Sequence, residues 1–175
     1  MAGGSEVVPL QVQYAPVAKR MVGPAYVLGP GDRIRIKVYN EADITGEYEV
    51  NSTGFVSIPL AGQIRAAGLT TRQLEGAVRS RLSEGIVNDP RVNVEIATYA
   101  PFYIHGEVKN AGEFAYRIGL TIQDAVALAG GFTYRANEWK VYVRRAGAAF
   151  EEVYALDARI PVSPGDNIRV PERYF

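Results

Sequence analysis

The chain has 175 residues, with 19 basic and 19 acidic side chains, one histidine and no cysteine. Balanced charge provides no overall field that would attract nucleic acid or an anionic membrane, and the lack of cysteine excludes a disulfide framework, a thiol nucleophile and a thiolate metal site. No run of about 18 apolar residues is present, so no transmembrane helix is predicted.

Residues 1–24 contain scattered prolines and no sustained periodicity, which predicts an extended leader.

A turn motif that occurs twice begins after this segment. The sequence Pro-Gly-Asp follows at 30–32 and returns at 164–166. Proline at the second position and glycine at the third favour a type II turn, because glycine accepts the positive φ that this turn requires. Each copy therefore predicts a turn that leads into a strand.

The first turn is followed by strict alternation of apolar and basic residues, which predicts a half-buried strand near 33–39. The apolar face is Ile34, Ile36 and Val38, and the basic face is Arg33, Arg35 and Lys37. We expect this basic face to line the path of an anionic polymer or to contact acidic residues of a neighbouring subunit. The acidic candidates come next in the chain: Glu41, Asp43, Glu47 and Glu49. The alternative is a strand face that is simply solvated.

Strands near 47–50 and 55–58 precede the first predicted helix. Thr70 is its expected N-cap, and Gln73 three residues later completes a capping box. Leu74, Val78 and Leu82 recur every four residues, which predicts one apolar stripe facing a sheet. Gly85 is expected to end the helix, and the alternating sequence "VNVEI" at 92–96 predicts the next strand.

The second half uses similar elements. A strand with a break at Gly106 and a short strand over 113–116 precede a helix capped by Thr121 and Asp124 and closed by a glycine pair at 130–131. Three more strands follow, and alternation in the first of them places Trp139 on one side with Val141 and Val143. The pattern predicts an α+β fold of two small lobes that meet near residues 98–101, each with one main helix.

Several segments carry a resemblance to a known family. Residues 26–82, which include the first Pro-Gly-Asp turn, resemble the export domain of Wza-like bacterial polysaccharide export proteins. Residues 102–136, with "GEVKNAGEF" and "AVALAGGFTYRA", are similar to the soluble-ligand-binding β-grasp (SLBB) module that follows it in that family. The resemblance implies a leader at 1–24, an export domain at 25–98 and an SLBB-like β-grasp domain at 99–175.

The same resemblance implies a function. Members form homo-oligomeric rings in the envelope of Gram-negative bacteria and guide capsular or exopolysaccharide, anionic or neutral, across the periplasm to the outer membrane. They work with an inner-membrane polysaccharide co-polymerase. The family's lipidated cysteine and terminal membrane helix have no counterpart here, so we expect a periplasmic fragment or a short branch served by a separate outer-membrane protein. The final sequence "VPERYF" favours the short branch.

Candidate binding residues lie where a loop follows the second helix. Tyr134, Arg135 and Trp139 are the expected polysaccharide contacts, because flat aromatic rings suit sugar faces, although such rings also fill cores. His105 lacks a recognisable nucleophile or metal-ligand spacing nearby, so we expect a structural or surface role, no cofactor and no catalysis. The alternatives are a monomeric carbohydrate-binding β-grasp module and, more remotely, an enzyme acting on the polysaccharide.

Overall fold

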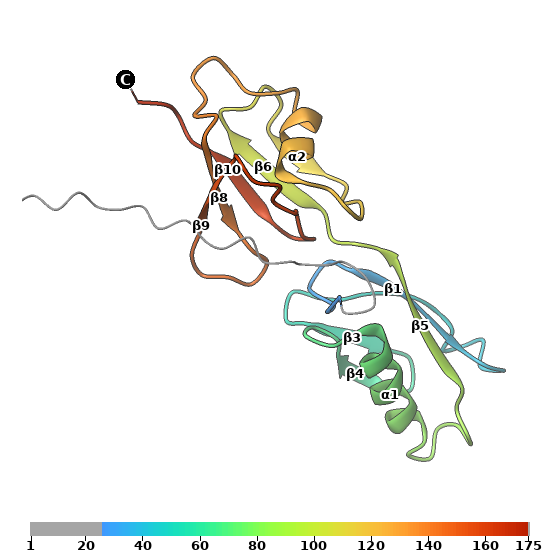
Figure 1. The fold of residues 1–175 in the computed structure, drawn as a ribbon. Coiled ribbons are helices and arrows are strands. Elements are labelled where there is room, and N and C mark those ends of the chain that lie inside the picture. The colour runs from blue at the N-terminus through green and yellow to red at the C-terminus, as the bar shows by residue number, and fades with distance from the viewer. Residues whose placement is uncertain (1–25, 175) are drawn as a thin grey trace, which may run out of the picture.

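The computed structural model describes residues 26–174, and the leader predicted for residues 1–24 lies outside this range. Two lobes follow one another along the chain and lie end to end, with the linker passing directly from one sheet to the other (Figure 1). Each lobe combines strands with one helix, so the predicted α+β fold of two small lobes is confirmed.

The first lobe is built on a three-stranded antiparallel sheet with the order β2-β1-β5, beside a β3–β4 hairpin. Its elements are β1 (Arg33–Val38), β2 (Gly46–Glu49), β3 (Phe55–Ile58), β4 (Gly62–Arg65), α1 (Thr71–Leu82) and β5 (Val92–Thr98). The sequence did not predict β4, because this segment has a single large apolar residue, Ile64, and therefore no alternating pattern. Pairing with β3 in the hairpin defines this strand.

Helix α1 is capped as its sequence predicts. The Thr70 hydroxyl accepts a hydrogen bond from the Gln73 amide at 3.2 Å, and the Gln73 side chain accepts one from the Thr70 amide at 3.0 Å. The predicted stripe of Leu74, Val78 and Leu82 is fully buried in the core of this lobe. The helix ends before Gly85, because Ser83 already caps its C-terminus.

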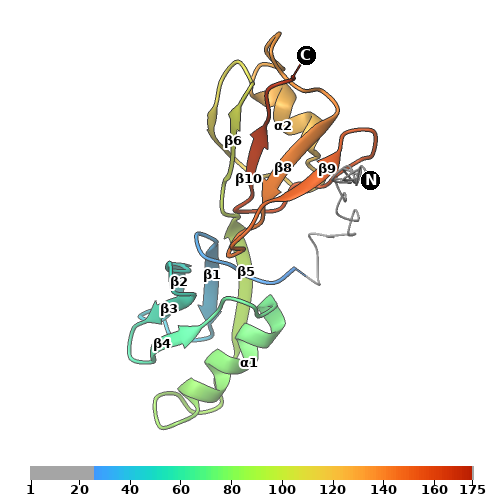
Figure 2. The same cartoon turned by 90° about the vertical axis from the view of Figure 1, so that its left-hand side faces the viewer.

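The second lobe has a five-stranded mixed sheet with the order β7-β6-β10-β8-β9, in which β10 runs parallel to β6 and the other pairs are antiparallel. Its elements are β6 (Phe102–Gly106), β7 (Gly112–Phe114), α2 (Ile122–Leu128), β8 (Lys140–Arg144), β9 (Glu152–Ala155) and β10 (Asn167–Val170). Helix α2 covers one face of this sheet, and Figure 2 looks onto the other face.

Helix α2 also forms its predicted capping box. The Asp124 carboxylate accepts hydrogen bonds from the Thr121 amide at 2.9 Å and from the Thr121 hydroxyl at 2.8 Å. These bonds lower the pKa of Asp124, and the bond from the Thr121 backbone amide has the largest effect. Beyond the helix, Gly130 and Gly131 take φ of +85° and +91°, so the glycine pair closes the helix as predicted.

One prediction about strand β8 is wrong. Alternation placed Trp139 on the same side as Val141 and Val143, which are buried, but Trp139 is 81% exposed. The reason is that the chain turns just before the strand, where the Asn137 side chain accepts a hydrogen bond from the Trp139 amide at 2.9 Å. Alternation therefore begins only at Lys140, the first residue of β8.

Candidate functional site

The two Pro-Gly-Asp sequences form the same turn. Their glycines take φ of +88° and +79°, as a type II turn requires. The aspartate amide donates to a backbone carbonyl three residues earlier in each copy, from Asp32 to Gly29 at 3.2 Å and from Asp166 to Ser163 at 3.1 Å. Each carboxylate also accepts a hydrogen bond from the amide of that same earlier residue, at 2.9 and 2.7 Å.

Both turns hold the linker between the lobes. The Asp32 carboxylate accepts a hydrogen bond from the Ala100 amide at 2.7 Å, so the first turn binds the linker from the first lobe. The second turn binds it from the other side, because the Gly165 amide donates to the Pro101 carbonyl at 2.9 Å. The repeated motif is therefore architectural, since each copy fixes its own strand and the junction at the same time.

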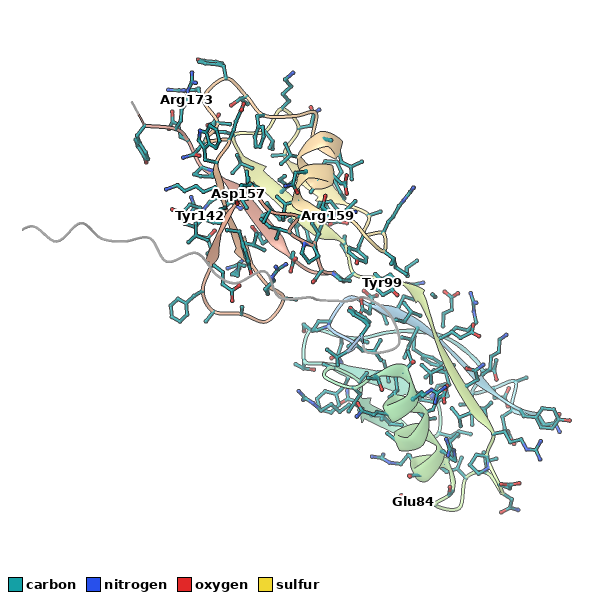
Figure 3. The ribbon with its side chains drawn as sticks, in the orientation of Figure 1. Glu84, Tyr99, Tyr142, Asp157, Arg159 and Arg173 are labelled. Carbon is teal, nitrogen blue, oxygen red and sulfur yellow. The ribbon has the colours of Figure 1, made fainter. Side chains whose placement is uncertain are left out.

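Aromatic rings reinforce this junction. Tyr99 lies at the junction of the lobes (Figure 3) and makes edge-to-face contacts with Tyr26 at 5.2 Å and with Tyr116 at 5.3 Å between ring centroids. The Tyr26 hydroxyl donates to the Asp32 carboxylate at 2.6 Å. Burial raises the pKa of Asp32, and burial also raises the pKa of Tyr116 to about 12. These contacts restrict movement of one lobe against the other.

The predicted polysaccharide contacts lie together on one exposed loop of the second lobe, between α2 and β8. Tyr134 and Trp139 are each 81% exposed, and Arg135 forms an ion pair with Glu172 at 3.0 Å. The backbone of this loop pairs with the segment after β10, where the Arg173 amide donates to the Arg135 carbonyl at 2.8 Å. The two rings are thus carried by an anchored backbone at the end of the lobe remote from the linker (Figure 1).

The basic face of β1 is compensated within its own sheet. Arg35 pairs with Glu47 at 2.9 Å, and Arg33 lies 3.8 Å from Glu47 and 3.9 Å from Glu49. The β1–β2 register places these acids directly opposite the arginines, so two of the acids expected to serve a neighbouring subunit are engaged in the same chain. Within residues 26–174, Lys37 is the residue of this face that forms no ion pair.

Sequence reasoning missed a cavity of about 430 Å³ on the open face of the second sheet. It is lined by side chains of three strands and of the β8–β9 connection: His105, Arg144, Phe150, Glu151, Asn167 and Arg169. His105 is exposed there, as expected for a surface role, and its Nε2 lies 2.7 Å from the Asn167 amide oxygen. The alternating patterns of β8 and β10 were the sequence signals for this face.

Arg169 is the most restrained charge in this cavity. Its guanidinium forms a forked hydrogen bond to Glu151, at 3.0 Å from Nε and 3.1 Å from Nη2, and lies 4.1 Å from the centroid of the Tyr142 ring. The Arg169 hydrogen bond lowers the pKa of Glu151. Glu151 therefore stays ionised at neutral pH and compensates the charge of Arg169.

Among residues 26–174, no three His, Cys, Asp or Glu side chains are grouped so that they could hold a metal ion. In the same range, neither helix has the length and apolar character needed to cross a membrane.

Comparison with known families divides the chain at the junction. Residues 21–97 match the model of the polysaccharide biosynthesis/export protein family, and residues 101–154 match that of the SLBB domain. The chain is 32% identical over 131 residues, or 68% of its length, to the exopolysaccharide production protein ExoF of Rhizobium meliloti (strain 1021).

Two further relatives match over most of the chain. The polysialic acid transport protein KpsD of Escherichia coli is 26% identical over 86% of this chain. The EPS I polysaccharide export outer membrane protein EpsA of Ralstonia nicotianae (strain ATCC BAA-1114 / GMI1000) is 29% identical over 87% of it. The chain spans 31% of the length of ExoF, 29% of KpsD and 43% of EpsA.

Proposed function

Because this chain belongs to the Wza-like bacterial polysaccharide export family, we propose that it is a subunit of a ring-shaped conduit for capsular or exopolysaccharide. The observation that carries the proposal is that an export domain is followed by an SLBB domain in this chain. A similar relative named as a polysaccharide export protein supports it. The conduit guides polymer across the periplasm to the outer membrane and performs no catalysis.

Several copies are needed to make such a conduit. A 19.1 kDa chain with two small lobes has no room for a channel, so the lumen must form between copies arranged around an axis. Fixed lobe orientation favours this arrangement, because repeated head-to-tail contacts close a ring only when every subunit has the same shape. A fixed orientation is supported by the contacts at the linker, which come from Asp32, Tyr99 and the second Pro-Gly-Asp turn.

The partners follow from the same proposal. The polymer enters from an inner-membrane polysaccharide co-polymerase and leaves through the outer membrane, with or without a separate outer-membrane protein. An acidic polymer is favoured by one relative, whose name assigns it the transport of polysialic acid. Of the basic residues on β1, Lys37 is the better candidate for a polymer or subunit contact, because Arg33 and Arg35 already pair with acids of their own sheet.

The proposal is tested by deleting the gene in its own bacterium and measuring polysaccharide inside and outside the cell. We expect surface polysaccharide to fall and polymer to remain in the cell, and we expect the full gene to restore export. Chemical cross-linking in the complemented strain should give a ladder of multimers. Unchanged export in the deletion strain would refute the export role, whereas a strict monomer that binds sugar would favour a carbohydrate-binding module.

We further predict that the exposed loop of the second lobe contacts the polymer. Replacing Tyr134 and Trp139 together with alanine should weaken binding of the purified native polysaccharide by about tenfold, because each ring supplies stacking area that alanine lacks. Unfolding should be unaffected, since both rings are 81% exposed. Isothermal titration calorimetry measures the effect, and Tyr39→Ala is a matched exposed aromatic on the other lobe. Equal affinities of the double variant and Tyr39→Ala would remove this loop from the binding surface.

A further inference from the structure

The open face of the second sheet is a regular array of polar and aromatic side chains. Strand register places Tyr142, Arg169 and His105 side by side in one row, and Arg144, Asn167 and Tyr103 in the next. The alternate residues of these strands, such as Val143 and Ile168, face α2 and are buried. In Figure 2 the strands lie in front of α2, and Figure 3 shows Tyr142 on the side of the sheet away from the helix.

The β8–β9 connection turns this face into a concave site. It contributes Phe150 and Glu151 to the wall of the cavity of about 430 Å³. Glu151 is held by its hydrogen bonds to Arg169, which stands on the sheet itself. Phe150 is 83% exposed, so its ring is available to a ligand that enters the cavity. With one apolar ring and several polar groups, this lining is more polar than that of a typical small-ligand pocket, which favours a polar ligand.

The charges of the cavity do not balance. Arg169 is compensated by Glu151, but within residues 26–174 Arg144 forms neither an ion pair nor a side-chain hydrogen bond. One guanidinium therefore remains for an external anion. Its planar fork of N–H donors matches a carboxylate, which binds through two parallel hydrogen bonds. The nearby negative charge of Glu151 disfavours a dianion such as a phosphate monoester and favours a group with a single charge.

The remaining groups suit a sugar ring. The paired His105 and Asn167 side chains offer polar atoms for hydroxyl groups, while Phe150 offers a flat apolar surface for the C–H face of a pyranose. We propose that this cavity binds an acidic sugar unit, a saccharide ring with one carboxylate that pairs with Arg144. This inference rests on the proposed function, because it assigns the second lobe a direct contact with an acidic polymer.

The test is a titration of the ¹⁵N-labelled 175-residue chain, followed by NMR. The probes are trigalacturonate, its methyl ester, which has the same rings without the charges, and N-acetylneuraminic acid. We expect the acids to shift the amides of Arg144, Asn167 and Arg169, with a Kd on the order of 1 mM. The ester should bind about fivefold more weakly or worse.

Variants locate the contact. Arg144→Gln should lower the affinity for both acids about fivefold, and Arg144→Lys should retain part of it, because lysine keeps the charge but loses the fork. Arg72→Gln removes the same charge from the exposed surface of α1 and should change nothing. The spectra themselves report whether each variant is folded, and Phe150→Ala provides a second, independent loss of affinity that leaves the charges intact.

Several results would overturn the inference. These are equal binding of trigalacturonate and its ester, shifts confined to the loop at 132–139, tighter binding of inorganic phosphate, or no shift with either acid at about 10 mM. The gene-deletion experiment and the titration test different claims, so each claim can be refuted without the other. An intact export phenotype with uronate binding at Arg144 would refute the proposed function alone, whereas lost export without such binding would refute the inference alone.

Discussion

Replacing Asp166 with asparagine is expected to lower the free energy of unfolding by about 3–5 kcal/mol. Asp166 is fully buried in the second Pro-Gly-Asp turn, and its carboxylate forms an ion pair with Arg145, whose side chain is only 7% exposed. The same carboxylate accepts the Ser163 amide at 2.7 Å. Asparagine keeps the shape but removes the counter-charge, so the Arg145 guanidinium remains buried without compensation, which is the costly state.

Urea denaturation followed by circular dichroism measures this change. The matched control is Glu151→Gln, which breaks the ion pair with Arg169 in the same lobe. Because that pair is exposed, its loss should cost no more than about 1 kcal/mol. Replacing Arg145 and Asp166 together with apolar residues of similar volume should recover much of the loss, since no isolated charge is then buried. If Asp166→Asn and Glu151→Gln lowered the free energy of unfolding equally, the claim that burial makes the Arg145–Asp166 pair costlier to break would be contradicted.

Replacing Leu74 with alanine should destabilise the protein by about 2–5 kcal/mol. Leu74 is fully buried and, with Val78 and Leu82, attaches α1 to the first sheet. Alanine removes apolar surface from the core and leaves a cavity that close-packed neighbours fill only in part. No other large side chain of α1 faces this core at the same level, because the stripe repeats only every four residues.

The measurement is the shift in free energy of unfolding relative to the unmodified chain. Arg72→Ala, on the exposed surface of the same helix, is the control and should change stability by about 0.5 kcal/mol or less. A shift of Leu74→Ala within that same range would show that α1 is not packed against the sheet as described.

Local features of this protein were predictable from sequence because their causes are local. Both helix starts depend on hydrogen bonds between residues three positions apart, at Thr70 with Gln73 and at Thr121 with Asp124. The two Pro-Gly-Asp turns are decided by the φ preferences of neighbouring residues, and the buried faces of β1 and α1 follow from periodicity. The order of the two domains was likewise recognisable from linear motifs.

Local patterns also have limits within a single strand. Trp139 continues the alternation of β8, yet it lies outside the strand and is exposed, because the chain turns where the Asn137 side chain accepts a hydrogen bond from the Trp139 amide. Strand β4 shows no alternation at all and exists through its pairing with β3. In both cases hydrogen bonds of the folded chain, and not the apolar pattern, decided where the strand lies.

The candidate site shows most clearly which features the sequence determines and which depend on the tertiary structure. The sequence by itself determined that Tyr134 and Trp139 follow a glycine pair on a loop, and their exposure agrees with that position. Only the tertiary structure decided that Arg33 and Arg35 are compensated by Glu47 and Glu49, because β1–β2 register sets which charges face each other.

The same holds for the junction and the cavity of the second lobe. The turns at Asp32 and Asp166 were each predictable, but their meeting at one linker was not. The cavity brings together His105, Arg144 and Arg169 from three strands that are far apart in sequence and adjacent in the sheet. Turns, caps and buried faces are decided by neighbours along the chain, whereas charge compensation and binding surfaces depend on strand order and register, which only long-range packing selects.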